Sequence, residues 1–333
     1  MAELVDAHDS KSCAVRRESS ILSPGTVQKT RTVVVVGPTA SGKSALGVRL
    51  AKRFNGEVIS ADSRQVYRGL DIGTGKITKK EMQGVRHHLI DVASPKKAFS
   101  AGAYVKRARR AIDDIAQRDR LPIIVGGTGF YIDALLGRIA IPDVRPHIAL
   151  RKKLSGKSAP QLYAQLKKID PARARSMDTP SECNNTVRLI RAIEIAHARR
   201  DCSESSDMIY HIAQLDADYA VLWIGVRPSD TVLKKRIEER LRARIKQGMV
   251  AEARHLHKSG LTYKRLEELG LEYRSLAHHL RGEITKEVME RELRSAIWRY
   301  ARKQIGYWKR NKDIWWIRPT RNTVEKLVRD WLT

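Results

Sequence analysis

The sequence predicts an α/β fold, with a parallel sheet flanked by helices and an inserted helical domain. Short β-branched runs such as residues 32–36 alternate with helical patterns, which is typical of parallel sheets built from strand–helix units. A glycine-rich turn that contains a lysine follows the first of these runs directly. From about residue 146 to residue 200 the pattern is helical and basic throughout, which indicates the insert.

Each expected strand is a short apolar run, as buried parallel strands generally are. The strands are expected at residues 32–36, 57–60, 88–92, 121–125, 220–226 and 314–317. A helix capped by Ser100 is expected to run to about residue 118, because Ala108 and Ile112 lie on one face. Further helices are expected at residues 45–54, 231–257 and 286–310.

These elements divide the chain into five segments. They are a tail at 1–31, the first part of the core at 32–139, the helical insert at 140–210, the completion of the core with a C-terminal helical part at 211–320, and a C-terminal tail at 321–333. The first tail is polar and aperiodic, so we expect it to be disordered. An alternative hypothesis is that it is a translated neighbouring tRNA gene, because Ser19 to Thr26 can be back-translated into a T-loop and a 3′ end. The true start would then lie near Val27 or beyond, and an intact native Met1 would contradict this.

The composition favours a polyanionic partner. Lys and Arg number 64 against 37 Asp and Glu, which gives a net charge of +27. An enzyme of small metabolites does not need this excess, whereas a nucleic-acid partner explains it. The cysteines Cys13, Cys183 and Cys202 lack metal-site spacing, which is typical of a reducing cytoplasm. No apolar run approaches the roughly 20 residues of a membrane span, so we expect a soluble, cytoplasmic monomer that does not bind membranes.

One segment matches a phosphate-binding loop in full. It is Gly37, Pro38, Thr39, Ala40, Ser41, Gly42, Lys43 and Ser44, in the pattern G-x-x-x-x-G-K-[ST] between a strand and a helix. The glycines let backbone N–H groups converge on phosphate oxygens, and the helix directs its positive dipole end at the same point. Lys43 adds a positive charge, and the Ser44 hydroxyl can hold Mg²⁺. The motif predicts phosphate binding on a P-loop NTPase-like sheet, but it does not identify the phosphate compound.

Two polar side chains follow other strands of the expected sheet. Asp62 comes just after the second strand, and Thr128 lies in the glycine-rich turn after residues 121–125. Since the carboxyl ends of parallel strands line the ligand crevice, Asp62 is a candidate general base or Mg²⁺ ligand. Each has a structural alternative: Asp62 as a turn or N-cap aspartate, and Thr128 as a helix N-cap.

The chain resembles the family of tRNA dimethylallyltransferases from about residue 32 to residue 317. The similar blocks are GPTASGKS at 37–44, DSRQVYRGLDIGTGK at 62–76, GVRHHLIDV at 84–92, LPIIVGGTGFYIDALL at 121–136, LGLEYR at 269–274 and YARKQIGYWKR at 300–310. Several distinct blocks in the right order are more specific than the loop alone. The resemblance implies that the dimethylallyl group of dimethylallyl diphosphate moves to N6 of the adenosine 3′ of the anticodon in tRNA. Pyrophosphate leaves, and Mg²⁺ is the implied cofactor.

The resemblance also implies roles for individual residues. Asp62 is the implied general base, Thr128 orients the base or the donor, and Lys43 stabilises the leaving diphosphate. Mg²⁺ is expected at Ser44 and Asp62. Arg236 and Arg240, four apart on one helix face, resemble the family's arginine pair near the diphosphate, with solvated helix charges as the alternative.

The implied partner is the anticodon stem-loop of tRNA. Its expected contacts are Asp62, Ser63, Arg64, Gln65, Thr128, Arg151, Val187, Arg188, Leu189, Ile190, Arg191, Leu269, Gly270, Leu271, Glu272, Tyr273, Arg274, Arg302, Lys303, Gln304, Tyr307, Trp308 and Lys309. Some positions depart from the family pattern: Ser44 replaces Thr, Val187 replaces Gln, Lys303 replaces Arg, and Gly306-Tyr307 replaces Thr-Trp. These changes put individual contacts in doubt, not the reaction.

Three alternatives stay open at this stage. A P-loop kinase shares the loop and the aspartate but does not explain the charge of +27. An enzyme that prenylates free AMP or ADP shares the chemistry but does not need the basic insert. A non-catalytic RNA-binding protein with a relic loop does not need Asp62. On the family reading, ATP is at most a weak competitor for the phosphate loop.

Overall fold

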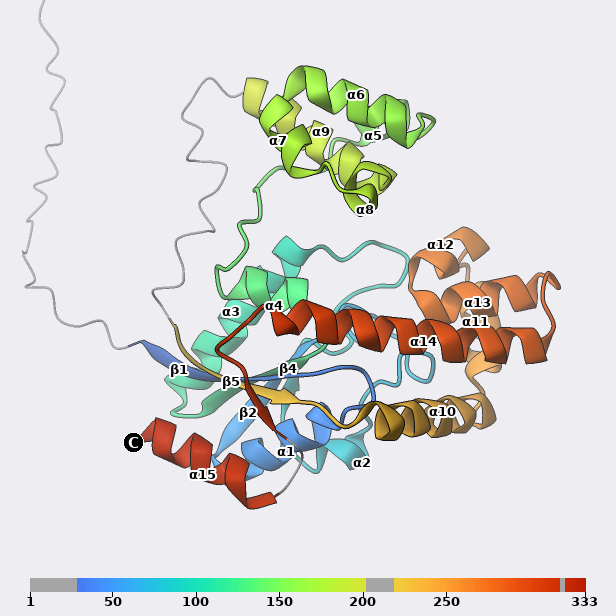
Figure 1. Ribbon diagram of the computed structural model, residues 1–333. Coiled ribbons are helices and arrows are strands. Elements are labelled where there is room, and N and C mark those ends of the chain that lie inside the picture. Colours follow the sequence, from blue (N-terminus) through green and yellow to red (C-terminus); the bar gives the residue numbers. More distant parts are fainter. Residues whose placement is uncertain (1–28, 202–218, 318–320) are drawn as a thin grey trace, which may run out of the picture.

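The computed structural model describes residues 29–201, 219–317 and 321–333, and its centre is a parallel sheet of six strands (Figure 1). The strands are β1 (Thr30–Val36), β2 (Gly56–Ala61), β3 (His87–His88), β4 (Leu121–Gly126), β5 (Tyr219–Val226) and β6 (Trp315–Ile317). Their order is β3-β2-β4-β1-β5-β6. Val34 of β1 is in register with Ile124 of β4 on one side and Trp223 of β5 on the other. The predicted parallel α/β fold is confirmed.

Helices cover both faces of the sheet. Val33 and Val35 face one apolar core and Val34 and Val36 the other, which is the period of two that a strand imposes. The first core is shared with α1 (Lys43–Arg53) and α15 (Arg321–Leu332), the second with α3 (Ala101–Gln117) and α4 (Gly129–Leu135). Residues 321–333, expected as a tail, therefore form a helix whose Val324 and Val328 are buried against the sheet.

A third apolar core lies beside the carboxyl ends of the strands and belongs to a helical bundle (Figure 1). Its helices are α10 (Asp230–Lys246), α11 (Met249–Lys258), α12 (Tyr263–Glu268), α13 (Leu271–Leu280) and α14 (Lys286–Lys309). The single helix expected over residues 231–257 was wrong, because the chain breaks before α11 at Gly248, whose φ of +100° suits glycine. Val66, Tyr67 and Leu70, which follow β2, are buried in this bundle core and not against the sheet.

The helical insert has an apolar core of its own. Its helices are α5 (Ile148–Leu154), α6 (Ala159–Ile169), α7 (Pro171–Ser176), α8 (Pro180–Cys183) and α9 (Thr186–Asp201). Leu162 and Leu166 of α6 pack with Leu189 and Ile193 of α9. In Figure 1 these helices stand apart from the sheet, joined to it by the segment after α4.

The strand expected at residues 88–92 is much shorter than the sequence indicates. Only His87–His88 pairs with β2, because Leu89 and Asp91 have φ values of +63° and +58°, which end the extended backbone. The short helix α2 (Lys79–Met82) precedes this strand. Most of the expected N-terminal tail lies outside the described residues. Among the described helices, none is long and apolar enough to cross a membrane.

Candidate active site

The phosphate loop joins β1 to α1 as expected, and its own backbone sets its shape. Gly37 and Gly42 have φ values of +152° and +97°, and a Cβ on Gly37 would lie 2.5 Å from the Val226 carbonyl oxygen. Only glycine fits these positions. Lys43 Nζ donates to the Pro38 carbonyl at 3.2 Å, across the loop. The loop is thus curled back on itself without a ligand.

A cavity of about 540 Å³ opens beside this loop. It is lined by residues 40–45 of the loop and α1, and by Gly75, Ile77, Glu81, Gln83, Arg236, Glu239 and Arg240. Arg236 Nη1 donates to the Ser41 carbonyl at 3.2 Å. Burial and the neighbouring Arg244 lower the pKa of the Arg240 guanidinium. Both arginines therefore lie at the cavity, Arg236 partly exposed and Arg240 exposed, and their role toward a diphosphate stays a prediction.

The electrostatics of the cavity favour an anion. Burial lowers the pKa of Lys43 to about 8, while Asp62 raises it and Arg240 lowers it further. The ammonium therefore lacks solvation, which an anionic ligand can replace. The Ser41 hydroxyl is buried and has no hydrogen-bond partner among the described residues. A diphosphate would meet both an under-solvated cation and an unpaired hydroxyl here.

Asp62 and Thr128 meet at the carboxyl ends of the neighbouring strands β2 and β4. Asp62 Oδ1 accepts the backbone N–H groups of Arg64 at 2.8 Å and Gln65 at 3.3 Å. Its Oδ2 accepts no hydrogen bond from the described part of the chain. Thr128 is the N-cap residue of α4, but its Oγ1 makes no capping bond to that helix and accepts from the Ser63 N–H at 3.0 Å instead. One oxygen of Asp62 thus shapes the turn, and the other is available to a ligand.

The Mg²⁺ site expected at Ser44 and Asp62 stays a prediction, since Ser44 lines the cavity and Asp62 does not. Mg²⁺ prefers oxygen ligands and keeps several waters. The Ser44 hydroxyl is exposed at the cavity, and Asp62 has an oxygen without a donor among the described residues. These two oxygens are the ones that the sequence predicts as ligands.

Another acidic cluster does not fit a metal. Glu57, His88 and Asp114 have ligand atoms within 4.8 Å of one another. However, the Glu57 oxygens already accept from Arg118, Arg120 and His88 at 2.5 to 3.2 Å. The hydrogen bond from Arg118 is the main reason why the pKa of Glu57 falls to about 2. Guanidinium groups occupy the place that a cation would take.

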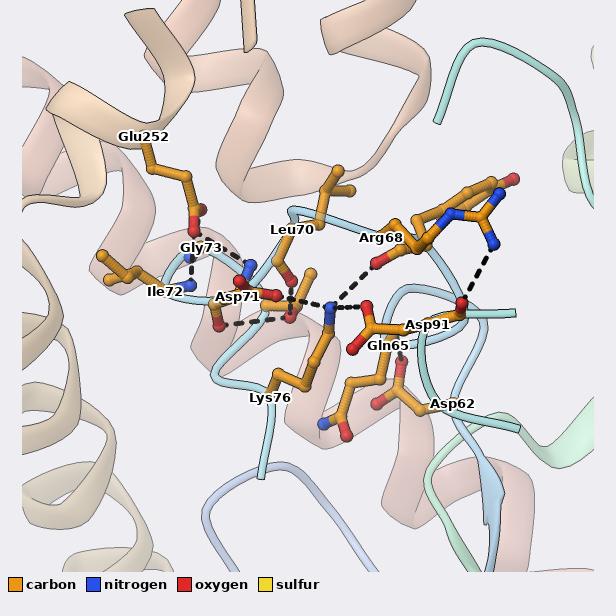
Figure 2. Close-up of polar contacts among 12 residues, drawn as sticks. Asp62, Gln65, Arg68, Leu70, Asp71, Ile72, Gly73, Lys76, Asp91 and Glu252 are labelled. Atoms are coloured by element: carbon orange, nitrogen blue, oxygen red, sulfur yellow. Dashed lines mark hydrogen bonds and ion pairs between the residues drawn. The ribbon is translucent and has the colours of Figure 1, made fainter. Parts of the chain in front are cut away.

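Residues 62–76, the block with the candidate base, are held by distant parts of the chain (Figure 2). The carboxylate of Glu252 on α11 accepts the backbone N–H groups of Asp71 at 2.9 Å, Ile72 at 2.7 Å and Gly73 at 2.9 Å. Glu252 carries no signal in the sequence, because nothing in the local pattern of α11 distinguishes it from other acidic residues. Only the tertiary structure places it under this block.

Lys76 closes the same block from within. Its Nζ donates to the Tyr67 carbonyl at 2.8 Å and pairs with Asp71 at 2.6 Å and Asp91 at 2.5 Å. Figure 2 shows these three oxygens converging on the ammonium. Lys76 belongs to the block that resembles the family, but only the structure shows that it connects Tyr67, Asp71 and Asp91.

Helix α14 supports the loops and does not present all its expected RNA contacts. Gln304 is buried, accepts from the Thr39 N–H at 2.8 Å and donates to the Gly127 carbonyl at 2.9 Å. The Tyr307 hydroxyl donates to Asp133 at 2.5 Å, and its ring fills the space that a Cβ on Gly129 would occupy. Glycines in this turn therefore admit side chains of α14, whereas the sequence suggests that they admit a ligand.

Five of the expected tRNA contacts are buried, so they cannot touch RNA while packed in this way. They are Leu189 at 0% exposed, Leu269, Tyr273 and Trp308 at 1%, and Gln304 at 6%. Leu269 and Tyr273 lie in the bundle core, Leu189 in the core of the insert, and Trp308 against the sheet. Apolar packing buries four of these side chains, and hydrogen bonds to Thr39 and Gly127 hold Gln304, which the motif resemblance does not reveal.

In the insert, two arginines expected to contact tRNA also pair with a buried acid, while 45% of the Arg151 and 32% of the Arg191 side chain stay exposed. Arg151 donates to both oxygens of Glu194 at 2.6 and 2.7 Å, and Arg191 Nη1 donates at 3.2 Å. Burial alone would raise the pKa of Glu194, but these hydrogen bonds hold it below its usual value. Arg188 pairs with Glu182, and Val187 is 75% exposed.

The remaining expected contacts lie at the surface. Exposed are Val187, Arg188, Arg274, Arg302, Lys303 and Lys309; partly exposed are Ser63, Arg64, Gln65, Ile190, Gly270, Leu271, Glu272 and Tyr307. Arg64 joins the candidate base to the bundle, since its Nη1 donates to the Glu268 carbonyl at 3.3 Å. Burial raises the pKa of Glu272, although Arg244 at 3.6 Å acts against this.

Comparison with known proteins identifies relatives over most of the chain. The family model for IPP transferases matches residues 65–312. The chain is 42% identical over 278 residues to tRNA dimethylallyltransferase 1 of Geotalea uraniireducens, covering 84% of this chain and 88% of that protein. It is 35% identical over 305 residues to tRNA dimethylallyltransferase of Oceanobacillus iheyensis, covering 90% and 95%.

Solved structures agree with this comparison. The full-length tRNA isopentenylpyrophosphate transferase of Bacillus halodurans matches with a TM-score of 0.65 at 32% identity, over 92% of this chain and 96% of that one. A structure of a eukaryotic dimethylallyltransferase acting on tRNA has a TM-score of 0.71 at 23% identity, which supports the fold.

Proposed function

The chain belongs to the IPP transferase family, and from this we propose that it transfers a dimethylallyl group from dimethylallyl diphosphate to tRNA. The acceptor is N6 of the adenosine 3′ of the anticodon. A C–N bond forms at N6, the allylic C–O bond of the donor breaks, and pyrophosphate leaves. The observation that carries this proposal is the cavity between the phosphate loop and Arg236 and Arg240, in a chain that carries Asp62 at the adjacent strand end.

The cavity residues act on the leaving group. As the C–O bond breaks, negative charge grows on the diphosphate, and donors already aimed at it stabilise the transition state. Lys43, Arg236 and Arg240 supply positive charge, and the unpaired Ser41 hydroxyl supplies a further hydrogen bond. Mg²⁺ held by the Ser44 hydroxyl and by water would neutralise part of the remaining charge.

Asp62 and Thr128 act on the acceptor. The N6 amine is a poor nucleophile, because its lone pair is conjugated with the purine ring. Asp62 Oδ2, which accepts no hydrogen bond within the described chain, takes the proton that N6 releases. Thr128, held by the Ser63 N–H, orients the base or the donor.

The target base must leave the anticodon stack to reach this site. Single-stranded loops are where proteins read RNA sequence, and basic side chains bind their phosphates. Trp308 and Tyr273 are buried in apolar cores. The exposed cations of the same segments are Arg274, Arg302, Lys303 and Lys309. We assign the RNA contacts of the bundle to these cations.

The test is mass spectrometry of tRNA nucleosides after incubation of the purified protein with dimethylallyl diphosphate and Mg²⁺. We expect N6-dimethylallyl adenosine in tRNA and stoichiometric pyrophosphate. Phosphoryl transfer from ATP to a small acceptor, with no prenylated nucleoside, would show a kinase. Equal prenylation of AMP and tRNA would show an adenylate prenyltransferase.

A further inference from the structure

The backbone of residues 71–73 is bound by a carboxylate from a distant helix. Glu252 lies 179 to 181 residues further along the chain and accepts three consecutive N–H groups of this turn. Its Oε1 also accepts the Tyr273 hydroxyl at 2.7 Å. All four donors are neutral N–H or O–H groups, so among the described residues the carboxylate is held by the turn and a phenol and not by a lysine or arginine. Such charge-assisted hydrogen bonds are among the stronger ones in proteins.

The opposite side of the turn is fixed by α10 and α13. Arg244 Nη1 donates to the Gly73 carbonyl at 2.8 Å. A Cβ on Gly73 would lie 2.6 Å from the Tyr273 ring, so the turn rests directly on that ring. Glu252, Arg244 and Tyr273, from three helices of the bundle, thus all contact Gly73.

Backbone hydrogen bonds connect the turn at residues 71–73 to Gly75 in the wall of the cavity. The Gly75 N–H donates to the Ile72 carbonyl at 3.0 Å, and the Lys76 N–H to the Asp71 carbonyl at 2.9 Å. Gly75 lines the cavity, and a Cβ there would lie 3.2 Å from Arg240 Nη2. Any shift of residues 71–73 therefore moves the cavity wall against the arginine that faces the diphosphate.

We propose that Glu252 is a positioning residue for the diphosphate cavity: its carboxylate sets the 71–75 turn and, through it, Gly75 and Arg240. This deepens the proposed function, on which it rests for the identity of the donor. Glu252 does not reach the cavity itself, so its effect falls on binding of the diphosphate and not on proton transfer. It also ties the cavity wall to α11, in the bundle whose surface carries the expected RNA contacts.

The test compares Glu252→Gln, Tyr273→Phe and a control, Glu292→Gln on the exposed face of α14. Glutamine replaces one acceptor oxygen by an NH₂ group that faces N–H donors. Inorganic pyrophosphate with Mg²⁺ is titrated into each full-length protein by calorimetry, which does not depend on any transfer reaction. Thermal unfolding, tRNA affinity and steady-state prenyl transfer are measured in parallel.

We expect Glu252→Gln to weaken pyrophosphate binding and to raise the donor KM by about tenfold, a usual consequence of a small displacement in a site. The affinity for tRNA should stay within about twofold, Tyr273→Phe should lose about threefold, and the control should match the unchanged protein. A folded Glu252→Gln with unchanged pyrophosphate affinity would overturn the proposal. Equal losses of tRNA and pyrophosphate binding with a broadened unfolding transition would also overturn it, as a general structural role.

Two further outcomes are decisive. If Glu252→Gln does not fold, Tyr273→Phe decides, because unchanged pyrophosphate affinity in that variant overturns the proposal. If the unchanged protein binds pyrophosphate but prenylates no tRNA, the proposed function fails, whereas the binding comparison still supports or overturns the role of Glu252.

Discussion

The phosphate loop and the 62–76 segment form two walls of one site, yet they are held in different ways. The curl of the phosphate loop comes from its own glycines, Gly37 and Gly42, and from the bond of Lys43 to Pro38, while Gln304 and Arg236 add one distant hydrogen bond each. The 62–76 segment is closed by partners from elsewhere, chiefly Glu252 on α11 and Arg244 on α10. Its apolar side chains are also buried in the bundle core and not against the sheet.

The difference teaches what a motif carries with it. A loop whose shape depends on φ angles and one lysine can be identified and understood from eight residues. The 62–76 segment donates backbone hydrogen bonds to a side chain on another helix. Its motif therefore identifies the residues of the segment but not the residues that hold it in place. Mutations in the supports should therefore affect the second wall without any change in its sequence.

The largest effect is expected at Asp62, where chemistry and turn can be separated. Asp62→Asn keeps an oxygen for the Arg64 and Gln65 N–H groups but cannot take a proton. We expect turnover to fall by at least roughly 10²-fold, the usual scale for loss of a general base, with tRNA affinity nearly unchanged. Single-turnover kinetics and tRNA binding measure this. Turnover equal to that of the surface control Asp113→Asn would refute the role of Asp62.

Gln304→Leu tests whether the phosphate loop depends on its distant contact. The variant leaves the buried Thr39 N–H and Gly127 carbonyl unpaired, so the free energy of unfolding should fall by about 2 kcal/mol. Urea unfolding measures this loss. Because the loop is shaped locally, pyrophosphate affinity should change by less than about threefold. If Gln304→Leu loses more pyrophosphate affinity than Glu252→Gln, the phosphate loop depends on its distant contact more than the 62–76 segment does, and the difference between the two walls is wrong.

The pH dependence of pyrophosphate binding reports on Lys43. Its pKa of about 8 lies below the 10.5 of a free lysine. Below about pH 8 the folded protein therefore carries the full free-energy cost of burying a charged Lys43, and a bound anion offsets this cost. Affinity should fall above pH 8, by at most about tenfold per pH unit, because free Lys43 loses the proton that the ligand needs. Lys43→Arg stays charged throughout and should show only the titration of pyrophosphate itself. Identical pH profiles for the two proteins would contradict this.

The smallest effect is expected at Lys76. Its ammonium is 6% exposed, but its partners Asp71 and Asp91 are 60% and 46% exposed, so water screens the pairs. Lys76→Met should lower the free energy of unfolding by about 1 kcal/mol or less, and high salt should reduce the difference. Urea unfolding at low and high salt measures it, with Lys79→Met on exposed α2 as the control. A loss above about 3 kcal/mol would make this tie as important as the carboxylate of Glu252.

The sequence by itself determined the sheet, the phosphate loop and the place of Asp62 and Thr128. These depend on short-range rules: apolar runs make buried strands, glycines permit the loop, and carboxyl ends of parallel strands meet. It also led to the family, through blocks spread along the chain.

Only the tertiary structure decided what the other side chains do. Trp308 and Tyr273 stand in blocks that resemble RNA contacts, but packing buries them, and Arg151, although exposed, pairs with the buried Glu194. Glu252 has no local signal at all, because its three backbone partners are more than 170 residues away. Burial and long-range pairing depend on which elements meet, and a pattern read along one segment does not contain that information.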